Sequence, residues 1–93
     1  MKPPEYIDNA KVILWDWSDS KPFGIILDTN GKIKSEIYGL AICKYEKTGD
    51  IYRFSCDKNW KTKQDANYDT IENAILNLPQ QYKNISVNWK EYE

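Results

Sequence analysis

Residues 40–57 read LAICKYEKTGDIYRFSCD, two runs of strand-forming residues on either side of a turn that contains a glycine. This arrangement predicts a β-hairpin, because β-branched and aromatic residues favour strands and glycine tolerates the positive φ of tight turns. We expect a three-residue loop with only Gly49 left-handed, since a two-residue loop would force positive φ on the β-branched Thr48. One face of the hairpin then carries Leu40, Ile42, Tyr52, Phe54 and Cys56. The other face carries Ala41, Cys43, Tyr45, Ile51, Arg53 and Ser55.

A second hairpin is predicted upstream, over residues 23–38, where the turn sequence DTNG separates two further strand-like runs. A three-residue loop with Gly31 left-handed pairs Asp28 with Lys32 and keeps the apolar residues together. A two-residue loop would mix them with charged residues on the same face. We therefore expect a shared inner face made of Phe23, Ile25, Leu27, Ile33, Ser35 and Ile37.

A helix is predicted over residues 70–78, where DTIE at residues 69–72 matches a capping box. In that motif the Asp69 carboxylate accepts a first-turn N–H group and Glu72 reaches back, while Pro79 ends the helix. Leu76 falls outside the apolar stripe and should be exposed. The stripe that should face the sheet consists of Ile71, Ala74, Ile75 and Leu78.

Two shorter patterns complete the fold. The apolar run at residues 12–15 predicts a strand, and the alternation of residues 85–89 predicts a last strand with Ile85, Val87 and Trp89 inward. Residues 4–10 fit either a short helix or an irregular arm. The whole chain, residues 1–93, is therefore expected to form one α+β domain. Its antiparallel, twisted sheet would have five or six strands, from two hairpins and a C-terminal strand, with one helix packed on one face.

The composition argues against several classes of function. Thirteen Lys and Arg residues stand against fourteen Asp and Glu, which gives a net charge of -1, and the chain has no histidine. A nearly neutral charge provides no general attraction for nucleic acid or an anionic membrane. The lack of histidine removes imidazole catalysis and histidine-ligated zinc. We therefore expect no metal, no cofactor and no catalytic residue.

The two cysteines, Cys43 and Cys56, are predicted to be free thiols. In the expected hairpin register they lie on opposite faces of the sheet, where no disulfide can form. The N-terminal residues lack the apolar core of a secretion signal, and no apolar run approaches the length of a membrane span. This pattern favours the cytoplasm, whose reducing conditions keep thiols reduced.

Candidate binding residues gather at two predicted strand ends that run into loops. They are Asp16, Trp17, Asp19, Asp57, Trp60 and Asp65. If both loops lie at the same edge of the sheet, exposed tryptophans would stand among carboxylates, a combination that suits a protein interface. The alternative is that Trp15 and Trp60 belong to the core and the aspartates cap turns.

We interpret the chain as a small bacterial-type interaction protein that binds a protein partner, for instance an immunity protein or an enzyme inhibitor. Such a task needs no catalytic residue. Two alternatives stay open. One is a nucleic-acid binding module that uses Lys58, Lys61 and Lys63 together with tryptophan and tyrosine side chains. The other is a small enzyme or a subunit of one.

Overall fold

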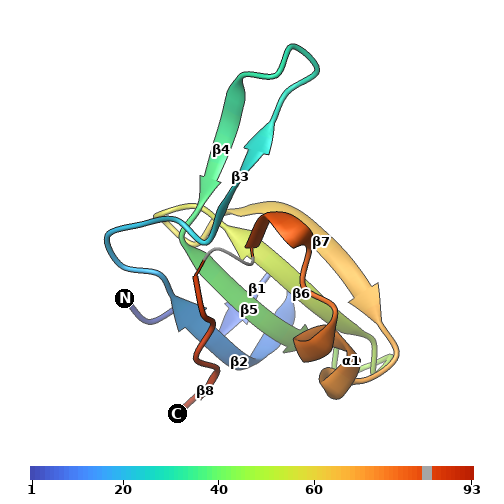
Figure 1. Ribbon diagram of the computed structural model, residues 1–93. Helices are drawn as coiled ribbons and strands as arrows, with labels where there is room; N and C mark the ends of the chain where they lie inside the picture. The colour runs from blue at the N-terminus through green and yellow to red at the C-terminus, as the bar shows by residue number, and fades with distance from the viewer. Residues whose placement is uncertain (83–84) are drawn as a thin grey trace.

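The computed structural model describes residues 1–82 and 85–93 and contains mostly antiparallel strands with one short α-helix (Figure 1). Its elements are β1 (Tyr6–Ile7), β2 (Ala10–Trp17), β3 (Gly24–Leu27), β4 (Ile33–Ile37), β5 (Gly39–Lys44), β6 (Ile51–Cys56), β7 (Thr62–Tyr68), α1 (Ile71–Leu76), the 3-10 turn η1 (Gln80–Tyr82) and β8 (Lys90–Glu91). The expected α+β class with one α-helix is therefore confirmed.

The strands form two sheets rather than the single twisted sheet that the sequence predicted. The larger sheet has six strands in the order β1-β2-β5-β6-β7, with β8 also paired to β2, and it curls into a half-barrel. The smaller sheet consists of β3 and β4 alone, and this hairpin projects from the half-barrel (Figure 1). The outer edge of β2 is shared: β1 pairs with its first residues and β8 with its middle.

The β5–β6 hairpin forms where it was predicted, but its loop is one residue longer. Gly49 is left-handed, with a φ of 80°, as expected. Its N–H group donates to the Tyr45 carbonyl at 2.7 Å, and the Tyr45 N–H donates to the Asp50 carbonyl at 3.0 Å, so four residues form the loop. Because side chains alternate along a strand, this extra residue reverses the predicted pairing of faces. Leu40 consequently lies opposite Ser55 rather than on the face of Tyr52 and Phe54.

The β3–β4 hairpin has the predicted turn and an unpredicted bulge. Gly31 has a φ of 78°, and the Asp28 N–H donates to the Lys32 carbonyl at 2.8 Å. A register shift between Ile26 and Leu27 then breaks the expected inner face. Leu27 and Ile33 lie opposite each other at the tip with 52% and 60% of their surfaces exposed. The predicted inner face therefore covers the core only at the base of the hairpin.

Strand β7 is absent from the sequence interpretation, which placed residues 57–65 in a loop. Only residues 57–61 turn; from Thr62 the chain pairs with β6 as an edge strand. Its inward positions carry small or polar residues, so no apolar alternation indicated a strand. The half-buried positions are Thr62, Gln64, Ala66 and Tyr68, and the exposed ones are Lys63, Asp65 and Asn67.

The chain termini also differ from expectation. Residues 6–7 form β1, so the N-terminal stretch is neither a helix nor wholly irregular. The predicted strand at residues 85–89 is not paired, and the last strand is β8, one residue further on. Ile85, Val87 and Trp89 nevertheless point inward and are half-buried, as the alternation predicted. The segment therefore packs on the sheet through side chains, and its backbone joins a ladder only at Lys90.

The half-barrel has two faces of different character, set by the strand register. We call one the helix face, because α1, η1 and residues 85–89 pack on it (Figure 1). Its strand residues include Leu14, Asp16, Leu40, Ile42, Arg53 and Ser55. We call the other the aromatic face. Its strand residues include Trp15, Trp17, Ala41, Cys43, Tyr52 and Phe54.

Helix α1 is shorter than predicted but has the predicted orientation. The cap is Thr70, whose hydroxyl accepts the Asn73 N–H at 3.0 Å, and not Asp69. Thr70 is the N-cap because it is the last residue with an extended backbone before the helix. From that conformation its side-chain oxygen reaches the N–H groups of the first turn. Ala74 is buried and Leu76 is 78% exposed, in agreement with the predicted stripe.

We expect Ile75→Ala to lower the free energy of unfolding by about 1–2 kcal/mol, below the range for a fully buried isoleucine. Ile75 is half-buried against the cluster formed by Ile42, Ile51 and Ala74. Leu76→Ala is the matched control and should change stability by less than about 0.5 kcal/mol. Urea titration followed by circular dichroism measures both. A larger loss for Leu76→Ala would show that the helix is rotated.

Both cysteines are free, as predicted, and fully buried, although the expected placement on opposite faces was wrong. The register places both cysteines on the aromatic face. Cys43 lies opposite Tyr52, whereas Cys56 lies opposite Gly39, which is four residues from Cys43 along β5. Burial raises the pKa of both thiols, that of Cys56 to about 12. The reactive thiolate is therefore scarce in the folded protein at neutral pH.

This burial predicts slow thiol chemistry. With an aromatic disulfide reagent at about pH 8, the native protein should react many times more slowly than a free thiol, whereas the denatured chain should release two equivalents rapidly. Rapid labelling of either thiol in the native protein would contradict its burial. Fewer than two reactive thiols after denaturation without reductant would show that a disulfide exists.

Candidate functional site

Three tryptophans gather at one end of the aromatic face. Trp15 and Trp17 come from β2, and Trp60 comes from the turn between β6 and β7. The Trp17 and Trp60 ring centroids lie 5.5 Å apart, and the Trp15 and Trp60 rings meet edge to face at 6.4 Å. Gly39 permits this packing, because a Cβ at that position would lie 2.5 Å from the Trp60 ring. The structure therefore brings Trp17 and Trp60 together, an arrangement that the sequence left open.

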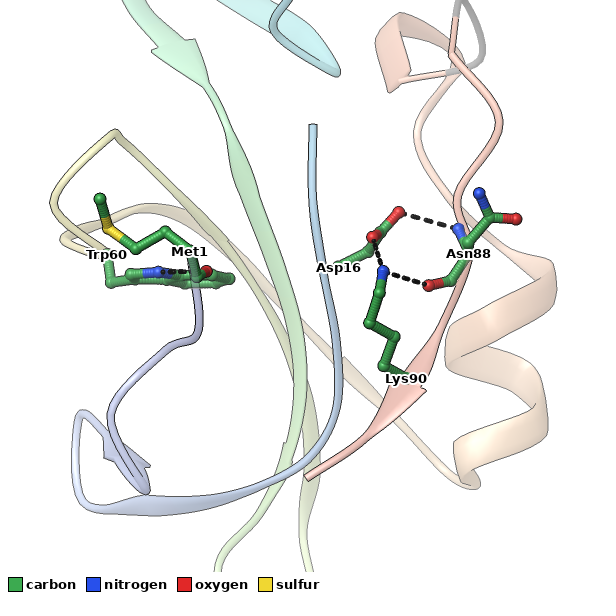
Figure 2. Close-up of polar contacts among 5 residues, drawn as sticks. All are labelled: Met1, Asp16, Trp60, Asn88 and Lys90. Carbon is green, nitrogen blue, oxygen red and sulfur yellow. Dashed lines mark hydrogen bonds and ion pairs between the residues drawn. The ribbon is translucent and has the colours of Figure 1, made fainter. Parts of the chain in front are cut away.

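Trp60 is a core residue, however, and not the exposed anchor that the hypothesis required. Its side chain is only 7% exposed, and its indole Nε1 donates to the Met1 carbonyl at 3.2 Å (Figure 2). The open alternative, that Trp60 belongs to the core, is the one that the structure supports. Trp15 and Trp17 are half-buried, so each keeps part of its ring accessible.

The backbone of Trp60 is strained, and a comparison of two turns shows why. DTNGK at residues 28–32 and DKNWK at residues 57–61 form the same loop, in which the aspartate carboxylate accepts two backbone N–H groups. The left-handed position is occupied by Gly31 in the first turn and by Trp60, with a φ of 60°, in the second. A bulky residue in this conformation costs about 1–2 kcal/mol, which the packing of the indole ring must offset.

Asp16 lies on the helix face, on the opposite side of the sheet from the tryptophans. It is 4% exposed, and its carboxylate accepts the Asn88 N–H at 2.8 Å and the Lys90 ammonium at 2.6 Å (Figure 2). These bonds hold the C-terminal segment against β2, on the side of the sheet opposite Trp60. Asp16 thus has a structural partner, and its inclusion in an exposed binding surface was wrong.

The other three aspartates of the predicted set stay at least partly accessible. Asp19 is exposed in the turn after β2, with a φ of 68°. Asp57 caps its turn and forms a 3.8 Å ion pair with Lys63. Asp65 lies opposite Phe54 on β7 and is exposed on the aromatic face. The structure therefore supports the capping alternative for Asp57 and leaves Asp65 free to meet a partner.

A second group of aromatic side chains on the same face was not assigned to the site from sequence. Tyr52 stacks on Phe54 at 5.8 Å, and Tyr45 meets Tyr52 edge to face at 5.5 Å. Tyr45 and Tyr52 are half-buried and line an open groove of about 570 Å³. The correct hairpin register would have identified them, because it places Tyr52 and Phe54 on the face of Trp15 and Trp17.

Of the three lysines in the nucleic-acid alternative, Lys61 is exposed, and the other two contact side chains of the same chain. The Lys58 ammonium lies 4.8 Å from the centre of the Tyr38 ring, and Lys63 pairs with Asp57. Trp60, the aromatic residue between them in sequence, is too deeply buried to stack on a nucleic-acid base. This turn therefore lacks the exposed aromatic platform on which the nucleic-acid alternative depended.

Arg53 is the one arginine of the chain and is buried on the helix face. Its guanidinium donates to the Ser55 hydroxyl at 3.2 Å and to the Tyr68 hydroxyl at 2.8 Å, and it lies 5.5 Å from the centre of the Tyr82 ring. Both hydrogen-bond partners are neutral hydroxyl groups, and two of the five guanidinium N–H groups donate to them. Arg53 therefore joins the sheet to the segments that cover it.

Within the described residues, no three His, Cys, Asp or Glu side chains come close enough to hold a metal ion. The same part of the chain contains no helix that is long and apolar enough to cross a bilayer.

Comparison of the chain with protein-family models, curated protein sequences and solved structures finds no match.

Proposed function

We propose that this protein binds a protein partner through its aromatic face. The observation that carries the proposal is a set of large aromatic side chains around the core of that face that remain partly accessible. They are Trp15, Trp17, Tyr45, Tyr52 and Tyr92. Aromatic side chains of this kind contribute much contact area with few rotatable bonds and are enriched in protein interfaces. The helices, in contrast, are packed on the other face.

Near Tyr45 and Tyr52 the charge favours a basic partner, whereas the Trp15 and Tyr92 rings already have the Lys90 and Lys2 ammonium groups 5.2 and 4.5 Å from their centres. Asp65 stands on the same face, and Glu46 and Asp50 line the groove of Tyr45 and Tyr52. Carboxylates beside accessible aromatic rings steer a positively charged surface toward the site and repel phosphates. An immunity protein or an enzyme inhibitor acts in this way, by occupying the surface of a partner without chemistry of its own. The buried, unpaired thiols are compatible with action in the cytoplasm.

The experiment is a capture with variants of the two faces. Nuclease-treated lysate of the source organism is incubated with three proteins. They are the wild type, a Trp17→Ala/Tyr52→Ala double variant, and Leu76→Ala as a control on the helix side. Recovery of a protein by wild type and Leu76→Ala should fall at least about tenfold for the double variant, as expected for the loss of interface anchors. Circular dichroism must show that the double variant is folded.

Two results would argue against the proposal. Equal recovery of the same proteins by the double variant would remove the aromatic face as the binding surface. Salt-sensitive recovery of nucleic acid without a protein would instead favour the nucleic-acid alternative.

A further inference from the structure

The groove at the β5–β6 loop combines two aromatic rings with two carboxylates, whereas each of the other described hollows that contain a carboxylate has a single ring. Tyr45 and Tyr52 form its apolar wall, and Glu46 and Asp50 stand at its rim. Its volume of about 570 Å³ exceeds that of one side chain, so a side chain can enter together with some of its own backbone. The remaining lining residues are Asn9, Lys47 and Thr48.

The rim carboxylates carry negative charge that no cation of the described chain neutralises by direct pairing. The ion pairs of the described residues join Lys63 to Asp57 and Lys90 to Asp16, and neither lies in the groove. Glu46 accepts the Tyr6 hydroxyl at 3.1 Å through Oε1, and Asp50 accepts the Thr48 hydroxyl at 3.0 Å through Oδ2. The second oxygen of each carboxylate has no partner among the described residues, so both can accept a donor from outside.

Two tyrosines at or beside the groove have raised pKa values. The hydrogen bond and charge of Glu46 raise the pKa of Tyr6, and burial together with the Asp8 charge raises that of Tyr45. The Tyr45 hydroxyl donates to the Asp8 carbonyl at 2.8 Å, which fixes its ring at the edge of the groove. A cation that entered the groove would meet both aromatic rings and carboxylate groups among the lining residues.

We propose that this groove binds an arginine side chain presented by an extended basic segment of the partner. A guanidinium is planar, stacks on aromatic rings and pairs with carboxylates through several N–H donors, which suits this lining better than a lysine ammonium. The inference rests on the proposed function, because it names the partner chemistry that one part of the aromatic face selects. Lys47, which also lines the groove, opposes binding by its charge.

The test uses acetylated tetra-arginine amide as the probe, added to the full-length isotope-labelled protein and followed by NMR chemical shifts. We expect the largest shifts around Tyr45 and Tyr52. Glu46→Gln keeps the acceptor for Tyr6 but removes the charge, and it should weaken binding roughly two- to fivefold. Lys47→Ala should strengthen binding by a similar factor. Tetra-lysine should bind more weakly than tetra-arginine.

Matched controls separate a specific groove from general attraction. Glu36→Gln and Lys34→Ala make the same charge changes on the projecting β3–β4 hairpin and should leave the affinity unchanged. If they alter binding as much as the groove variants, or if the shifts spread evenly over the surface, the groove proposal is wrong.

The two proposals can fail independently. Capture of a protein partner that is lost in the Trp17→Ala/Tyr52→Ala variant, without tetra-arginine shifts in the groove, would overturn only the arginine site. Shifts confined to the groove, without any protein captured through the aromatic face, would instead count against the proposed function.

Discussion

Trp60→Ala should lower the free energy of unfolding by about 3–5 kcal/mol, a large part of the roughly 5–15 kcal/mol expected for a domain of this size. The substitution removes a buried indole that packs against Trp15, Trp17 and the backbone of Gly39. It also removes the hydrogen bond to the Met1 carbonyl. Urea titration followed by tryptophan fluorescence and circular dichroism measures the loss.

A second variant at this position tests the backbone strain separately. Alanine retains the cost of the left-handed conformation, whereas glycine adopts a positive φ without that cost, as it does in the equivalent turn at Gly31. Trp60→Gly should therefore be about 1 kcal/mol more stable than Trp60→Ala, the reverse of the usual order of these residues. If the glycine variant is the less stable of the two, the φ of 60° does not represent strain.

Asp16→Ala should cost about 2–3 kcal/mol, because it removes two charge-assisted hydrogen bonds to the C-terminal segment. The cost stays below that of a fully buried ion pair, since half of the Lys90 side chain is exposed and its ammonium can be hydrated instead. The same variant should accelerate hydrogen exchange of the Asn88 N–H, which donates to Asp16 in the wild type.

Asp16→Asn provides the matched control for this prediction. It keeps an oxygen for the Asn88 N–H and removes only the charge that pairs with Lys90, so its loss should be about half that of the alanine variant. Unchanged stability and unchanged Asn88 exchange in Asp16→Ala would show that the C-terminal segment is held by the packing of Val87 and Trp89 alone.

Turn chemistry was predictable from the sequence, and strand register was less so. Gly31 and Gly49 both occupy the left-handed positions assigned to them, because few residues other than glycine tolerate that conformation. Loop length depends on hydrogen bonds that leave little trace in composition, and one additional residue in the β5–β6 loop exchanged the faces of β6 relative to β5. This error concealed Tyr52 as a member of the aromatic face.

The site was predicted in part for similar reasons. The sequence placed Trp17 and Trp60 at two strand ends and left open whether the two loops meet, and the structure brings their rings together. The burial of Trp60 could not be predicted from the sequence. Trp60 occupies the left-handed turn position that glycine holds in the equivalent turn, and nothing in the local sequence indicates what its ring packs against. The partners of Asp16 lie 72 and 74 residues away in the chain, a separation that no local pattern can bridge.

Site-specific photo-cross-linking shows whether the proposed basic protein partner meets the aromatic face. A photoreactive phenylalanine analogue is placed at position 17 on the aromatic face or, as the control, at position 76 on the exposed side of α1. Irradiation in lysate of the source organism should join the position-17 protein to one basic protein, and should yield no such product from position 76. Cross-linking of the same partner from position 76 but not from position 17 would contradict the claim.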